Sequence, residues 1–79
     1  MTDYQKRITI NPKVMLGKPV IKGTRIPVSL ILDLLAAGYD FNKILKAYPG
    51  LKKDDIVAAL RFSESLLERK KTLHGQTFA

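Results

Sequence analysis

The fold is decided by one stretch of sequence near the N-terminus, Gly17-Lys18-Pro19-Val20-Ile21-Lys22-Gly23-Thr24-Arg25-Ile26-Pro27-Val28. Its two glycines can adopt positive φ at little cost, and its two prolines fix φ and favour extended geometry in the residue before each. The apolar, β-branched pair Val20-Ile21 is typical of a short buried strand. The stretch therefore predicts a rigid scaffold that presents Lys18, Lys22 and Arg25.

Three helices are predicted after this stretch. Residues 28–37 are almost wholly apolar, which is typical of a central core helix or a dimer seam, and Gly38 is expected to end this helix. Asp40 is a suitable N-cap for a second helix over residues 41–48. The third helix is predicted to begin at residue 52 or 53 and to end near residue 70.

A short strand is predicted over residues 7–10, where apolar and polar side chains alternate. We expect it to pair with Val20-Ile21 or with its counterpart in a second subunit. The 79-residue chain is thus predicted to form one mainly α domain. It has a basic β arm or hairpin over residues 1–27, a three-helix helix-turn-helix bundle over residues 28–71 and a flexible tail over residues 72–79.

The third helix also predicts self-association. Two apolar stripes run along it, one through Ile56, Ala59 and Leu60 and the other through Phe62 and Leu66. Together they expose more apolar surface than a three-helix core of this size can cover. A homodimer is therefore expected, and the first helix, the third helix and the N-terminal strand are the candidate contacts.

Positive charge is concentrated in the predicted arm. The formal net charge of the chain is +7, and residues 1–27 contain six basic residues against Asp3 alone, a net charge of +5. This asymmetry predicts an anionic partner, either nucleic acid or an acidic protein surface. A solvated basic face that only maintains solubility is the alternative. The candidate contact residues are Lys18, Lys22, Arg25, Lys43, Lys46, Lys52, Lys53 and Arg61.

Catalytic and metal chemistry is not predicted. The chain has no cysteine, and its one histidine, His74, lies in the predicted tail. The carboxylates are assigned to helix caps and exposed faces, so we expect no enzyme, no cofactor and no metal. The lack of cysteine, of a secretory signal and of an apolar run that could span a bilayer predicts a cytoplasmic protein with no membrane partner.

The sequence resembles the domain-of-unknown-function 433 family (DUF433). The resemblance is strongest over residues 17–28, and the segments 34–38, 44–49 and 54–60 match the family pattern in order and spacing. It implies a homeodomain-like three-helix fold and a VapB-type antitoxin that neutralises a PIN-like ribonuclease toxin and represses its own operon. No catalytic residue carries over from the family.

One position departs from that family's pattern. Lys52 stands where the family usually has Thr or Ser, so the third helix lacks a capping side-chain oxygen, at a cost of about 1 kcal/mol. Asp54 and Asp55 are expected to act as helix-dipole partners and to offset part of this cost. Because these acids would repel phosphate, we expect the basic arm to make much of any DNA contact.

Two functions are therefore open from the sequence. One is a DNA-binding antitoxin that represses its own promoter. The other is a protein-interaction module whose basic arm covers an acidic partner surface, with no role for DNA.

Overall fold

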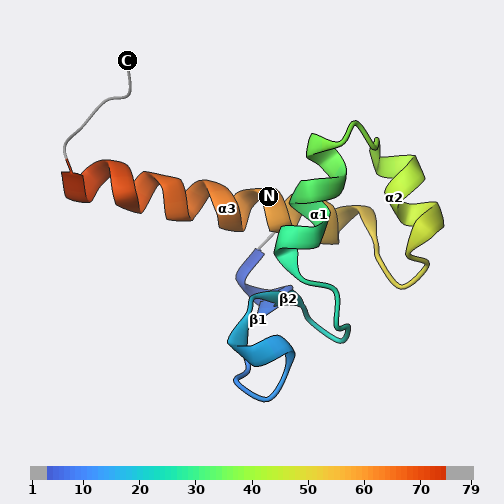
Figure 1. Cartoon of the computed structure of the whole chain (residues 1–79), viewed down its shortest axis with the longest axis horizontal. Helices are drawn as coiled ribbons and strands as arrows, with labels where there is room; N and C mark the ends of the chain where they lie inside the picture. The colour runs from blue at the N-terminus through green and yellow to red at the C-terminus, as the bar shows by residue number, and fades with distance from the viewer. Residues whose placement is uncertain (1–3, 75–79) are drawn as a thin grey trace.

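The computed structural model describes residues 4–74, and the side chains of residues 4–67. It contains three helices: α1 spans Val28–Ala36, α2 spans Phe41–Ala47 and α3 spans Lys53–His74. All three predicted helices are present, and α1 and α2 end within one residue of the predicted boundaries. Figure 1 shows α3 as the long helix of the molecule, with α1 and α2 at its N-terminal end.

The N-terminal arm consists of two short strands and two 3₁₀ turns. The strand β1 (Ile8–Thr9) lies between η1 (Tyr4–Lys6) and η2 (Met15–Gly17), and β2 (Val20–Ile21) follows. The strands are antiparallel, with Ile8 opposite Ile21 and Thr9 opposite Val20. The strand predicted near residue 8 therefore finds its partner within its own chain, the first of the two pairings expected for it.

The arm and the helices share one core. Ile21 is 1% exposed, and it belongs to the same buried cluster as residues of all three helices and of the turn before α3. That cluster consists of Ile21, Val28, Ile31, Ile44, Leu51, Ile56 and Ala59. The arm is thus part of the packed body and not an appendage to it. The chain forms a mainly helical domain with a two-stranded antiparallel sheet.

The chain reverses after α1 through a Schellman motif. Gly38 has φ +96°, its amide donates to the Leu35 carbonyl at 3.0 Å, and the Tyr39 amide donates to the Leu34 carbonyl at 3.0 Å. This pair of hydrogen bonds satisfies carbonyls that the end of the helix leaves free. The predicted role of Gly38 as the helix stop is confirmed.

The second helix begins and ends as its sequence predicts. The Asp40 side chain accepts a hydrogen bond from the Lys43 amide at 2.8 Å, the expected N-cap. After α2 the Leu51 amide donates to the Tyr48 carbonyl at 2.9 Å, and this closes the turn at Pro49-Gly50. Leu51 is 5% exposed and anchors the turn in the core.

The third helix is longer than predicted. It runs to His74, so residues 72–74, assigned from the sequence to a flexible tail, are helical. Residues 75–79 lie outside the described part of the chain, and the tail stays a prediction there. None of the helices in residues 4–74 is both long enough and apolar enough to cross a membrane.

The glycine at the end of α1 provides a stability test. Gly38→Ala is expected to lower the free energy of unfolding by about 1–2 kcal/mol, because a side chain at positive φ is strained. Gly50→Ala is the matched control: Gly50 has no positive φ, and its added methyl group would meet no atom within 4 Å. Urea denaturation followed by circular dichroism measures both. Equal losses for the two variants would contradict the Schellman assignment.

Candidate nucleic-acid and partner interface

The turn after β2 is built by Gly23 and Thr24. The Thr24 amide donates to the Ile21 carbonyl at 3.0 Å, and Gly23 has φ +81°, as in a type II turn. The Thr24 hydroxyl donates to the same carbonyl at 2.7 Å and accepts from the Ile26 amide at 3.0 Å. The Ile21 amide in turn donates to the Ile26 carbonyl at 3.0 Å. Hydrogen bonds of the Thr24 side chain and of the Ile21 backbone therefore fix the backbone of the turn over residues 21–26.

This turn holds Lys22 and Arg25 on the outside of the arm. Both side chains are exposed, whereas Val20 and Ile21 just before them are fully buried. The Lys22 amide also donates to the Arg7 carbonyl at 2.8 Å, which ties the turn to the start of β1. The rigid scaffold predicted for these cations is present, and their binding role stays a prediction.

The far end of the arm has a feature that the sequence did not predict. Met15 and Leu16 have φ of 51° and 57°, a left-handed conformation that costs about 1–2 kcal/mol in a residue with a side chain. Leu16 is nevertheless 93% exposed, so burial within the described chain does not repay this cost. Hydrogen bonds of 3.1 Å, from the Gly17 amide to the Val14 carbonyl and from the Lys18 amide to the Met15 carbonyl, fix the backbone.

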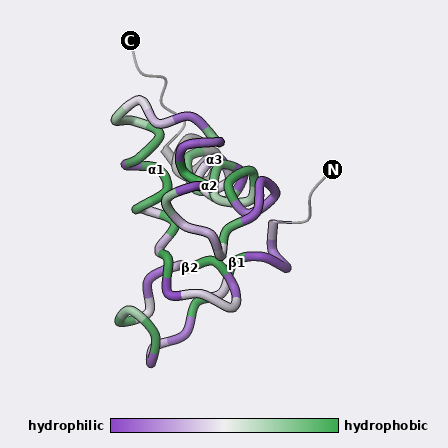
Figure 2. Tube along the Cα trace, turned by 90° about the vertical axis from the view of Figure 1, so that its right-hand side faces the viewer, coloured by the Kyte–Doolittle hydropathy of each residue, from purple (hydrophilic) through white to green (hydrophobic). Residues whose placement is uncertain are grey.

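This end of the arm, η2, therefore presents an exposed aliphatic side chain on a fixed turn. It is the blue turn at the bottom of Figure 1, and the tube of Figure 2 is partly coloured hydrophobic at the same end. The only local signal for the turn was Gly17, because Met and Leu rarely adopt positive φ.

The other five candidate cations lie on or beside the second and third helices. Lys43 and Lys46 are on α2, Lys52 and Lys53 are at the start of α3, and Arg61 lies two turns further along α3. All five are exposed. Lys43 Nζ lies 4.2 Å from the centroid of the Tyr39 ring, and Arg61 Nη1 lies 3.1 Å from Glu64 Oε1. The eight candidates are thus distributed over the arm, α2 and α3.

The arm is fixed to α3 by an ion pair that the sequence did not predict. Arg7 Nη1 donates to Asp55 Oδ1 at 3.0 Å, and Arg7 Nη2 lies 3.4 Å from Asp54 Oδ2. Asp55 is only 6% exposed, a burial that the sequence did not predict. Arg7 and Asp55 are 48 residues apart, and no local pattern marks them as partners.

Asp55 also caps the start of α3. Its Oδ2 accepts a hydrogen bond from the Lys52 amide at 2.9 Å, which is the half of a capping box that reaches back from the first turn. The sequence predicted only a helix-dipole role for Asp55, and the structure adds this hydrogen bond to the Lys52 amide. One carboxylate therefore holds the arm through Oδ1 and the start of the helix through Oδ2.

This ion pair changes the electrostatics at the start of α3. Asp55 is buried against the Arg7 guanidinium, and the exposed Asp54 lies beside the same cation. Lys52 and Lys53, both exposed, stand next to them. The start of α3 is therefore less repulsive to phosphate than the sequence implied. The Arg7 guanidinium is paired with acids of its own chain.

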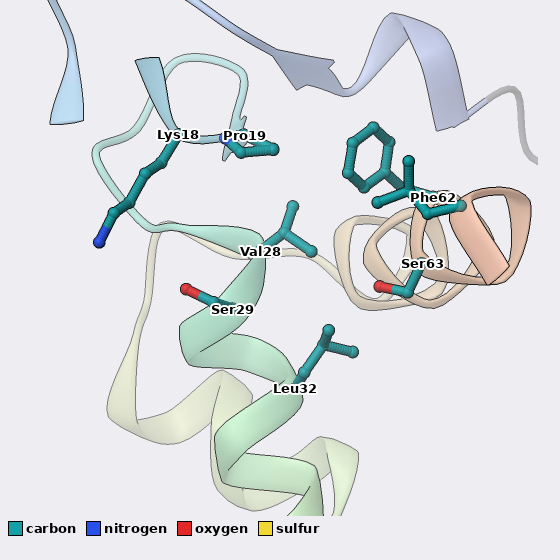
Figure 3. Close-up of a pocket in the computed structure, with 8 residues that line it drawn as sticks. Lys18, Pro19, Val28, Ser29, Leu32, Phe62 and Ser63 are labelled. Carbon is teal, nitrogen blue, oxygen red and sulfur yellow. The ribbon is translucent and has the colours of Figure 1, made fainter. Parts of the chain in front are cut away.

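A shallow apolar groove of about 340 Å³ lies between the arm, α1 and α3. Its walls are formed by Pro19, Val28, Ser29, Leu32, Phe62, Ser63 and Leu66, with Lys18 at the rim. Figure 3 shows the Val28 and Leu32 side chains pointing from α1 toward α3, while the Lys18 side chain points away from the groove. The groove therefore suits an apolar side chain and not an anion.

Metal ligands do not converge in the part of the chain that the structure describes. No three His, Cys, Asp or Glu side chains there are placed to hold a metal ion. That the chain is not an enzyme and needs no cofactor stays a prediction.

Comparisons with known proteins agree on one family. Residues 8–63 match the family model described as a protein of unknown function, DUF433. The fold is similar to the crystal structure of a DUF433 member protein from Anabaena variabilis, with a TM-score of 0.75 and 33% identity over 91% of this chain and 71% of that one.

Two relatives of known sequence are similar over shorter shares of their length. The uncharacterized protein y4eO of Sinorhizobium fredii is 34% identical over 58 residues, which are 73% of this chain and 26% of the relative. An uncharacterized protein of Archaeoglobus fulgidus is 70% identical over 23 residues, which are 29% of this chain and 64% of the relative. The chain therefore spans about a quarter of the first relative and under two thirds of the second.

The ion pair between the arm and α3 can be tested through stability. Arg7→Ala is expected to lower the free energy of unfolding by about 2 kcal/mol, because Asp55 stays buried without its charged donor. Arg61→Ala removes a pair whose side chains are 47% and 58% exposed, and is expected to cost about 0.5 kcal/mol or less. Urea denaturation gives both values. A cost for Arg7→Ala no larger than that of the control would contradict the assignment.

Proposed function

We propose, from the premise that this chain belongs to the DUF433 family, that it is the antitoxin of a type II toxin–antitoxin system and binds DNA to repress its own operon. The antitoxin role and the partner, a PIN-like ribonuclease toxin, follow from the resemblance described for the sequence. The DNA-binding role is supported by the start of α3. There Arg7 pairs with the two acids that would otherwise repel phosphate, and this observation carries the proposal.

We infer that α2 and α3 act as a homeodomain-like helix-turn-helix. In that motif the N-terminal residues of the second helix contact base edges in the major groove. The corresponding positions here are Lys52 and Lys53, which are exposed. Ile44 on α2 is fully buried and Leu51 in the turn is 5% exposed, so the helix and the turn that precede these lysines are anchored in the core.

The arm supplies a second basic surface for the same DNA. Lys22 and Arg25 lie on a turn that is hydrogen-bonded to β1, and Arg7 fixes β1 to α3. The arm cations therefore keep a set position relative to Lys52 and Lys53, which reduces the ordering cost of binding. Arg25 has the bidentate geometry that suits guanine or a phosphate group.

A second function is favoured by the end of the arm. Leu16 is 93% exposed on a fixed turn, and the exposed Lys13 and Lys18 lie on either side of it in the sequence. A basic and apolar tip is complementary to an acidic protein surface that contains an apolar hollow. In this alternative the arm covers the carboxylates of a ribonuclease active site, and DNA has no part.

Fluorescence anisotropy tests the DNA-binding proposal, with labelled duplexes of the sequence upstream of the gene and of a scrambled control at two salt concentrations. We expect tighter binding to the upstream duplex that persists at the higher salt. Four to six phosphate contacts give a slope of log affinity against log salt of about −4 to −5. Arg25→Ala is expected to weaken binding by about 5- to 150-fold, and Arg61→Ala, whose guanidinium is paired with Glu64, by less.

The double variant Lys22→Glu/Arg25→Glu completes this test, with circular dichroism as the check that the helices remain. It should lose the preference for the upstream duplex. Equal binding of the two duplexes that collapses with salt would contradict sequence-specific DNA recognition. Release of toxin activity by the same double variant would then support the alternative, whereas retained inhibition would contradict it.

A further inference from the structure

We propose that a second copy of this chain covers the face of α3 formed by Leu60, Ser63, Leu66 and Leu67, here called the dimer face. Leu60 is 40% exposed, Leu66 is 45% exposed and Leu67 is 68% exposed. Ser63 lies three residues from Leu60 and from Leu66 and four from Leu67. With about 100° per residue, all four side chains fall within about a third of the helix circumference, on one side of α3. The face is therefore a continuous apolar surface and not a scatter of single residues.

In the C-terminal half of α3, Leu66 lines the groove shared with α1 and the arm, and the helix then continues past these elements. Figure 1 shows this half extending away from α1, α2 and the arm. Leu66 is in line with the core-facing residues Ala59 and Phe62 along the helix, yet it is nearly half exposed because the bundle has ended. An apolar side chain that continues a core face beyond its core indicates an intermolecular contact.

The shape of the dimer face suits a copy of itself. It contains projecting leucines and, beside them, the apolar groove that Ser63 and Leu66 share with Leu32 of α1. The Ser63 hydroxyl donates to the Ala59 carbonyl at 2.9 Å, so this small residue needs no polar partner and lets another helix approach closely. A leucine from one copy can therefore enter the groove of the other.

The order of residues along α3 fits an antiparallel pair about a two-fold axis near Ser63. In that arrangement Leu60 of one copy lies beside Leu66 and Leu67 of the other, so apolar side chains meet on both sides of the axis. A two-fold contact requires a self-complementary patch of this kind.

Charge explains why the occupant is a second copy. Each copy has a net charge of +7, so two copies repel wherever exposed lysines meet. Residues 54–67 contain three acids, one arginine and no lysine, and in the antiparallel pair the basic residues 69–71 of one copy come alongside this less basic stretch of the other. A polyanion gains nothing from this face, and a chain of 79 residues benefits from the extra buried apolar area.

This inference deepens the proposed function without depending on it. The contact uses α3 and the groove beside it, and the exposed Lys22 and Arg25 of each copy's arm lie on another element, β2 and the turn after it. Two helix-turn-helix units related by a two-fold axis read two half-sites on DNA. Because the oligomeric state is measured without DNA or toxin, failure of the dimer leaves the antitoxin proposal standing, and failure of DNA binding leaves the dimer standing.

The test is the molar mass of the purified chain by size-exclusion chromatography with light scattering, over a dilution series. The wild-type protein is expected at twice its chain mass of 8.9 kDa. Leu66→Glu/Leu67→Glu is expected at the chain mass, because four buried carboxylates would oppose each other. Leu16→Glu is the matched control, since Leu16 is a more exposed leucine on the arm, and it is expected to remain dimeric.

A wild-type protein that is monomeric throughout the series would overturn the proposal. So would a double variant that keeps the dimer mass, or a Leu16→Glu variant that loses it while Leu66→Glu/Leu67→Glu does not. Circular dichroism checks that each variant keeps its helices. If the double variant unfolds, Leu67→Glu alone decides the question, because that side chain is two-thirds exposed and its replacement does not disturb the core.

Discussion

The Asp55 carboxylate is the point on which the rest of the structure depends. One oxygen accepts the hydrogen bond of the Arg7 guanidinium, and the other accepts that of the Lys52 amide. The first contact fixes the arm, and the second fixes the start of α3. Because Asp55 is buried, loss of either donor would leave a charged oxygen without its partner in a poorly solvated position.

The surface of the molecule therefore has a basic part and an apolar part. Toward the N-terminal end of α3 lie the cations of the arm and of the helix start, held at set positions by the turn after β2 and by the ion pair. Along the middle of α3 lies the apolar face of Leu60, Ser63, Leu66 and Leu67. In the two proposals made above, the basic surface would bind DNA and the apolar face a second copy, and like charges would oppose self-association through the basic surface.

The local features of the fold were predictable, because each depends on a few neighbouring residues. Gly38 marked the end of α1 and Asp40 marked the start of α2, and both act as predicted. The end of α3 was placed too early, because the basic residues 69–71 are typical of a last turn. The next strong stop signal in the sequence is Gly75, directly after the observed end at His74.

The features that escaped prediction depend on contacts between distant segments or on strained backbone. Arg7 was counted as one of several free cations, and only the folded chain brings it to Asp55, 48 residues away. Composition predicted which side chains form the candidate site, and all eight cations are exposed. It did not predict that Arg7 pairs with Asp54 and Asp55, or that Met15 and Leu16 adopt positive φ.

Native-state hydrogen exchange tests most directly whether the ion pair makes the arm and the helices one cooperative unit. The Lys22 amide, which donates to the Arg7 carbonyl in the arm, is the probe, and the amide of the buried Ala59 in α3 is the reference. If the arm is fixed as described, both amides exchange with the same free energy of opening. Exchange of the Lys22 amide at the unprotected rate, with Ala59 still protected, would contradict the account.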